Sequence, residues 1–208
     1  MLLMEAMKKE LILVAGMPAT GKSTLAAKLG DAFELPVLEK DEIKEEMFDT
    51  VGYADLAAKR QLDKAAAAVL LRVARAVLKR GSAILVNNFD ADMAQDVQRM
   101  IDECGCRAVT VFLGGDADVL YARYVERDKK HLRHQGHTFI DRYPPREGDV
   151  TDLSMTRQYF KDRFEGHGMA DFRIDGPRID VDATHPERID VGELLAQIKC
   201  ALREEVLS

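Results

Sequence analysis

The sequence contains no tryptophan, only three cysteines and no apolar run as long as a membrane span, and each absence narrows the classes of protein to consider. An odd number of cysteines, without a second Cys pair at zinc-site spacing, favours reduced thiols over a disulfide framework or a zinc site. No apolar leader follows Met1, so we expect a cytoplasmic protein without a membrane partner. The formal net charge of −6 excludes an overall basic field for non-specific binding of nucleic acids.

The length and the pattern of the chain predict a single α/β domain over residues 1–208. Apolar runs alternate with stretches of helical periodicity, which is typical of a doubly wound fold. We expect strands at 10–15, 36–39, 83–86, 107–113 and 178–181. We expect helices at 22–33, 42–48, 54–80, 94–103, 117–128, 153–164 and 191–205. The alternation stops at about 129–150, where His, Arg and Pro residues crowd together, and we interpret this segment as a lid.

A glycine-bounded loop, GMPATGKS, connects the first expected strand to the first expected helix. It fits the pattern G-x-x-x-x-G-K-[ST], in which backbone N–H groups surround the β- and γ-phosphates of a nucleotide. In this pattern Lys22 adds a positive charge at the phosphates, and the Ser23 hydroxyl coordinates Mg²⁺. The loop therefore predicts ATP and Mg²⁺ as cofactors. The residues expected to contact the nucleotide are Gly16, Met17, Pro18, Ala19, Thr20, Gly21, Lys22, Ser23 and Thr24.

Asp41 follows the second expected strand, at the edge of the sheet where open α/β folds bind their ligands. A carboxylate at this place can accept the proton of a substrate hydroxyl, so Asp41 is the candidate general base and a candidate metal ligand beside Ser23. Lys44 stands three residues later on the same helix face and is a candidate for holding an anionic group of the substrate. The alternative is an ordinary helix acid paired with a lysine.

The third expected strand ends in Asn87 and Asn88, where a carboxylate would be useful for organising Mg²⁺. An asparagine brings no negative charge, so metal organisation falls to Ser23, Asp41 and the nucleotide, with Asp90 or Asp92 as weaker candidates. Asn88 is a candidate substrate contact. The alternative for Asn88 is a polar turn that bonds its own backbone.

A local excess of positive charge follows the fourth expected strand, with seven Lys and Arg against three Asp and Glu between Tyr121 and Arg146. Arg123 and Arg127 lie four residues apart on one helix face, so both are candidate catalytic residues that neutralise charge on the transferring phosphoryl group. The alternative is a solvated charged face.

The segment RHQGH is compact and holds two histidines three residues apart. We found no third and fourth ligands at plausible spacing for a metal site. Arg133, His134 and His137 are therefore candidate contacts to the substrate or to the backbone of the lid.

Together these residues resemble the P-loop kinases of the polynucleotide-kinase, zeta-toxin and chloramphenicol-phosphotransferase kind. The resemblance covers most of the chain. It depends on four motifs: GMPATGKST at 16–24, KDEIKEEMF at 40–48, LYARYVERD at 120–128 and RHQGH at 133–137, the last like the R-H-x-G-H of a bacterial branch of these ATP-binding proteins.

The resemblance implies a three-layer fold with a five-stranded parallel sheet in the order 2-3-1-4-5 and a helical lid. It also implies that Asp41 is the general base, that Lys22 and Ser23 hold ATP·Mg²⁺, and that Arg123 or Arg127 belongs to the lid. The loop around Thr184 would face the adenine. Asn87 departs from the family pattern, since a carboxylate is common there.

These observations predict a kinase that moves the γ-phosphoryl group of ATP to the hydroxyl of a small molecule. A first alternative is a polynucleotide 5′-hydroxyl kinase, which needs a basic groove and stacking aromatics, whereas aromatic residues make up 6% of this chain. A second alternative is a nucleotide switch that hydrolyses ATP without phosphorylating any substrate.

Overall fold

The computed structural model describes residues 9–138, 140–147, 149, 155–166 and 168–204. Five parallel strands form one sheet in the order β2-β3-β1-β4-β5, which confirms the predicted fold and strand order. The strands are β1 (Glu10–Gly16), β2 (Val37–Glu39), β3 (Ala83–Val86), β4 (Arg107–Gly114) and β5 (Arg178–Asp182).

Seven α-helices and three short 3₁₀ helices connect or follow the strands in the described part of the chain. The α-helices are α1 (Lys22–Phe33), α2 (Lys40–Val51), α3 (Leu56–Leu78), α4 (Ala94–Cys104), α5 (Ala117–Lys129), α6 (Arg157–Gly166) and α7 (Val191–Glu204). The 3₁₀ helices are η1 (Ala91–Met93), η2 (Gln135–His137) and η3 (Pro186–Arg188). None of the helices in the described ranges has the length and apolar character needed to cross a membrane.

The predicted boundaries differ from the structure mainly at two helices. Helix α2 begins two residues earlier than expected and includes Asp41 in its first turn. Helix α6 begins at Arg157 rather than at 153, and residues 150–154 lie outside the described residues.

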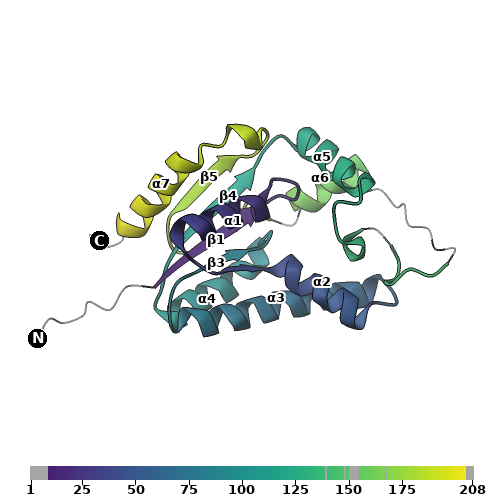
Figure 1. Cartoon of the computed structure of the whole chain (residues 1–208), viewed down its shortest axis with the longest axis horizontal. Helices are drawn as coiled ribbons and strands as arrows, with labels where there is room; N and C mark the ends of the chain where they lie inside the picture. The colour runs from purple at the N-terminus through teal and green to yellow at the C-terminus, as the bar shows by residue number, and fades with distance from the viewer. Residues whose placement is uncertain (1–8, 139, 148, 150–154, 167, 205–208) are drawn as a thin grey trace, which may run out of the picture.

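Successive side chains of β1 point to opposite faces of the sheet, and helices cover both faces, so the fold has three layers. Leu11, Leu13 and Ala15 face one side of the sheet, Ile12 and Val14 face the other, and all five are completely buried. Burial of each large apolar side chain stabilises the fold by about 1.5–3 kcal/mol. Helices α3 and α4 cover the first face, and α1 and α7 cover the second (Figure 1).

After α5, the described part of the segment predicted as a lid passes beside the end of α2 (Figure 1). Tyr53 and Tyr143 exchange two backbone hydrogen bonds of 2.8 Å, and the ring of Phe48 packs between this pair and η2. The buried side chain of Ile140 completes this small cluster. These contacts pack the described part of the segment against α2.

Candidate active site

The glycine-rich loop leaves β1 between the carboxyl ends of the two neighbouring strands. The N–H of Gly16 donates to the Asn88 carbonyl (3.2 Å), and the N–H of Met17 donates to the Leu113 carbonyl (3.0 Å). Gly16 has a φ of 126°, and a Cβ there would lie 2.1 Å from the Leu113 carbonyl oxygen. Only glycine fits this close approach, so the loop geometry depends on the first residue of the motif.

The loop and the first turn of α1 present hydrogen-bond donors that the described residues do not use. No hydrogen bond among these residues takes up the backbone N–H groups of 20–23. Gly21 precedes α1 in the left-handed conformation, and the positive end of the helix dipole lies at the same place. These features fit the binding of phosphate groups.

Lys22 bends back over its own loop. Its ammonium donates to the carbonyls of Gly16 (3.1 Å) and Met17 (2.7 Å). Burial lowers the pKa of Lys22 to about 7. A bound phosphate would supply the negative charge that keeps this ammonium protonated.

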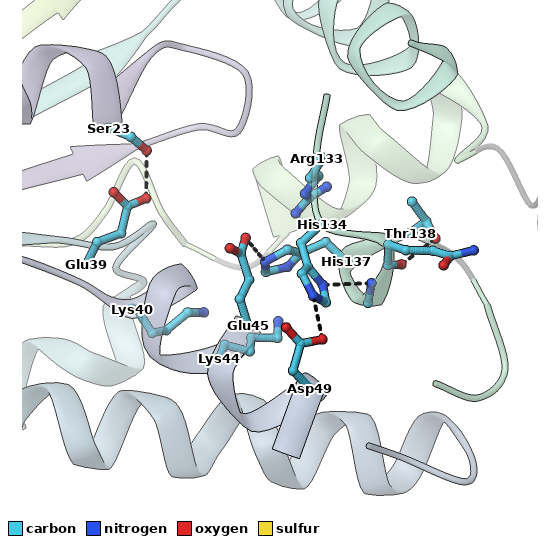
Figure 2. A network of polar contacts seen from close by, with 12 residues as sticks. Ser23, Glu39, Lys40, Lys44, Glu45, Asp49, Arg133, His134, His137 and Thr138 are labelled. Carbon is cyan, nitrogen blue, oxygen red and sulfur yellow. Dashed lines mark hydrogen bonds and ion pairs between the residues drawn. The ribbon is translucent and has the colours of Figure 1, made fainter. Parts of the chain in front are cut away.

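Glu39 is the carboxylate beside Ser23, and the sequence reasoning missed it. The Ser23 hydroxyl donates to Glu39 Oε1 at 2.6 Å (Figure 2). Burial raises the pKa of Glu39 and the negative charge of Asp41 adds to this effect, while the Ser23 hydrogen bond opposes it. Such a hydroxyl–carboxylate pair fits Mg²⁺, which is bound through one or two carboxylates together with substrate phosphates. In the sequence, the one signal for this role was that Glu39 is a second acidic residue, two positions before Asp41.

The side chains of Asn87 and Asp90, after β3, form hydrogen bonds within their own turn. The side-chain carbonyl of Asn87 accepts from the Asn88 N–H (2.8 Å), and its amide donates to the Met93 sulfur (3.2 Å). Asp90 accepts from the Met93 N–H (3.2 Å). Asp92 is exposed on η1 and does not line the cavity of the site. The prediction of Asp90 or Asp92 as a metal residue is therefore not supported.

A cavity of about 570 Å³ joins the glycine-rich loop to Asp41. The lining includes Lys22, Ser23, Glu39, Asp41, Asn88 and Arg127. Burial disfavours the charged form of Asp41, but the neighbouring His137, Lys40, Lys44 and Arg133 outweigh it and hold the pKa of this carboxyl below its usual value. Asp41 is therefore ionised at neutral pH and able to accept a proton or a hydrogen bond.

Lys44 lines the same cavity, but its ion-pair partner is on α3. Its ammonium donates to Asp63 Oδ1 at 2.6 Å, and the Lys40 ammonium donates to the same atom at 3.0 Å. The simple Asp41–Lys44 pair that the sequence left open as an alternative is not the contact observed.

Arg127 extends from α5 into the cavity and has spare hydrogen-bonding capacity. Its Nε is buried without a hydrogen-bond partner among the described residues, and its guanidinium lies 5.5 Å from the ring centre of Tyr124. Burial lowers its pKa, and the charge of Arg133 lowers it further. A buried, unpartnered N–H next to the glycine-rich loop fits a phosphate oxygen.

Arg123 does not reach the cavity, although it lies on the same helix. Its guanidinium donates to the carbonyls of Ala19 (2.8 Å), Ala183 (3.1 Å) and Thr184 (2.8 Å). Arg123 therefore joins the glycine-rich loop to the loop after β5, and the structure does not support it as a residue that contacts the transferring phosphoryl group. Thr184 is in turn held by the N–H of Asp116, which donates to its Oγ1 (2.9 Å).

The RHQGH segment divides between the cavity and α2. Arg133 and His137 line the cavity, whereas His134 does not. His134 Nδ1 accepts from the Gly136 N–H (3.0 Å), which places the ring proton on Nε2 facing Asp49 (3.0 Å). The prediction that His134 contacts the substrate is therefore not supported, because both ring nitrogens serve the packing of the segment on α2.

His137 is buried against α2, with 2% of its side chain exposed. Its Nε2 lies 2.9 Å from Glu45 Oε1 (Figure 2). Burial lowers the pKa of His137, and the positive charge of Arg133 lowers it further, so the ring is neutral at pH 7. No group of three or more His, Cys, Asp or Glu side chains within the described ranges is arranged to hold a metal ion. The two histidines thus attach the segment to α2.

Gly136 has no space for a side chain. A Cβ at this position would lie 2.3 Å from the ring of Phe48, which is completely buried. We expect Gly136→Ala to lower the free energy of unfolding by about 1–3 kcal/mol because it overpacks this contact. Gly81→Ala is the control, since a Cβ there meets no atom within 4 Å, and we expect it to be neutral or stabilising in the same urea titration. Equal stability of the two variants would contradict the packing described here.

Comparisons with known proteins identify the family and agree with the fold. Residues 11–142 match the family model described as AAA domain. A solved structure of a candidate kinase from Chloroflexus aurantiacus is 26% identical, covers 96% of this chain and 99% of its own, and superposes with a TM-score of 0.77. No curated protein matches the chain significantly.

Two further structures share the fold. A gluconokinase from Sinorhizobium meliloti is 16% identical, with 94% of this chain and 92% of that chain covered and a TM-score of 0.54. A shikimate kinase from Aquifex aeolicus is 15% identical, with coverages of 95% and 98% and a TM-score of 0.52. The fold is thus that of P-loop kinases, and because the family model spans more than half of the sequence, the chain belongs to the AAA-domain family.

Proposed function

We propose that the protein transfers the γ-phosphoryl group of ATP to a hydroxyl group of a small molecule. The observation that carries this proposal is the placement of Asp41 in one cavity with Lys22, Ser23 and Arg127. The fold shared with kinases supports it, as does the resemblance of four motifs to the polynucleotide-kinase, zeta-toxin and chloramphenicol-phosphotransferase group. The cavity volume suits small ligands, which favours a small acceptor over a polymer.

In the transfer step, a bond forms between the acceptor oxygen and the γ-phosphorus while the bond from that phosphorus to the β–γ bridging oxygen breaks. The hydroxyl proton passes to the Asp41 carboxylate, and ADP leaves. Lys22 and the loop N–H groups bind the phosphates, and Arg127 stabilises negative charge on the phosphoryl group during its transfer. Thr184 and the loop held by Arg123 would contact the nucleotide base.

Ser23 and Glu39 would hold the magnesium ion, together with the phosphates. When bound, the ion neutralises charge on the β- and γ-phosphates. Glu39 also orients the Ser23 hydroxyl through their hydrogen bond. The carboxylate that the family usually places after the third strand is thereby supplied from the second.

Glu39→Gln is expected to raise the magnesium concentration needed for half-maximal turnover by about tenfold to a hundredfold, the usual effect of losing a residue that supports a metal site. A magnesium titration at saturating nucleotide measures it. Glu46→Gln is the matched control, because Glu46 is exposed on α2 and does not line the cavity. An unchanged magnesium requirement in the Glu39 variant would remove this residue from the metal site.

A screen with γ-labelled ATP against hydroxylated metabolites, aminoglycoside-like antibiotics and 5′-hydroxyl oligonucleotides tests the proposed function. We expect slow hydrolysis of ATP alone and faster turnover with the true acceptor, because closure around the acceptor excludes water. Label transfer to oligonucleotides with a steep salt dependence would instead indicate a polynucleotide kinase. Hydrolysis that rises only with a protein partner and labels no acceptor would indicate a nucleotide switch.

A further inference from the structure

The cavity is positively charged although the protein is acidic. Seven Lys and Arg residues and only three Asp and Glu residues line it, whereas the whole chain has a formal charge of −6. Two of these three carboxylates already have partners within the protein. Asp63 is already bound by two lysines, and Glu39 accepts the Ser23 hydroxyl. The excess positive charge of the cavity is therefore available to bind an anionic ligand.

Part of the positive charge lies on the acceptor side, away from the glycine-rich loop. Lys22 and Arg127 belong to the nucleotide end, whereas Lys59, Arg60 and Lys64 come from the first turns of α3. Lys59 contacts the predicted lid segment, because its ammonium donates to the Thr138 carbonyl at 2.6 Å. Arg60 and Lys64 make no such contact with the described part of that segment.

Arg60 and Lys64 are exposed, line the cavity and form no ion pair with any residue in the described ranges. They stand four residues apart, so they share one face of α3. Two like charges at this spacing destabilise a helix by a few tenths of a kcal/mol. An anion between them would remove this repulsion, and a guanidinium pairs with phosphate or carboxylate through two parallel hydrogen bonds.

We propose that the acceptor is a small alcohol that also carries a phosphate or carboxylate group, which Arg60 and Lys64 bind while the hydroxyl faces Asp41. This inference rests on the proposed function and narrows its substrate class. The small volume of the cavity argues against the phosphodiester backbone of a nucleic acid as the source of the anion.

Matched acceptors test the inference with γ-labelled ATP and magnesium. One series is glycerol, glycerol 3-phosphate and glycerate, and the others are glucose and ribose, each with its phosphate ester and its aldonic acid. We expect kcat/KM for an anionic member to exceed that of its neutral partner by about tenfold or more, as for other hydrogen bonds to charged groups. The preference should fall as salt rises, because both side chains are exposed.

The variants Arg60→Gln and Lys64→Gln should each reduce the preference for the anionic acceptor, mainly by raising its KM, and the double variant should lose most of it. Arg72→Gln is the control, because Arg72 is exposed on the same helix, does not line the cavity and should leave the preference and the basal hydrolysis unchanged. Circular dichroism checks that all variants fold.

The outcomes separate this inference from the proposed function. Equal transfer to neutral and anionic acceptors, or a preference that both variants retain, overturns the inference and leaves the kinase proposal standing. Hydrolysis without label transfer to any acceptor overturns the proposed function and the inference with it. Transfer to 5′-hydroxyl oligonucleotides but to no small acceptor overturns the inference, because the anion then belongs to a polymer.

Discussion

Asp41→Asn is expected to slow phosphoryl transfer by about a hundredfold or more while nucleotide binding is retained. The amide keeps the shape of the side chain but cannot accept the hydroxyl proton, and general-base catalysis contributes about 10²–10⁴-fold. Asp41 stands at the start of α2, immediately after β2, and the cations around it keep its carboxyl ionised. Acceptor-dependent turnover and calorimetric nucleotide binding together measure the two effects.

Asp92→Asn is the control for this experiment, because Asp92 is an exposed acid outside the cavity. It should behave as the parent protein does. Transfer at the parent rate in the Asp41 variant would remove this residue from the mechanism, and an equal loss in both variants would point to a general effect of charge.

Lys22→Ala is expected to abolish nucleotide binding or turnover. The ammonium is the one side-chain cation of the glycine-rich loop, and it already lies within hydrogen-bond distance of two loop carbonyls. Its removal takes away the charge at the phosphates and also loosens the loop itself. Lys28→Ala on the exposed side of α1 removes an equal charge from the same helix and should bind nucleotide normally.

Calorimetry with Mg²⁺ and either ATP or GTP measures this loss, and circular dichroism shows whether the variant is folded. Parent-like affinity in a folded Lys22→Ala protein would argue against the phosphate site at this loop.

Much of the fold was predictable because its signals are local. The continuous apolar run of β1 and the glycine-bounded turn that follows it place the glycine-rich loop correctly, and Asp41 follows from its position after the next strand. Strand order came from the resemblance to known kinases and not from periodicity. The early start of α2 was missed, because helix boundaries depend on tertiary packing as well as on propensity.

The site residues that were misjudged depend on packing between distant segments. Glu39 matches no motif, and only the path of β2 beside the start of α1 brings it to Ser23. Arg123 and Arg127 share a helix face in the sequence, yet three carbonyls occupy the first while the second retains a buried, unpartnered Nε. Likewise, the sequence could not show which of His134 and His137 reaches the cavity, and only His137 lines it.

The three carbonyl contacts of Arg123 connect two loops that are far apart in the sequence. Ala19, in the left-handed conformation at φ 60°, and the backbone at Ala183 and Thr184 are connected through one guanidinium. In the proposed kinase, these are the loop that binds the phosphates and the loop that contacts the nucleotide base. A substitution of Arg123 would therefore disturb both proposed contacts at the same time.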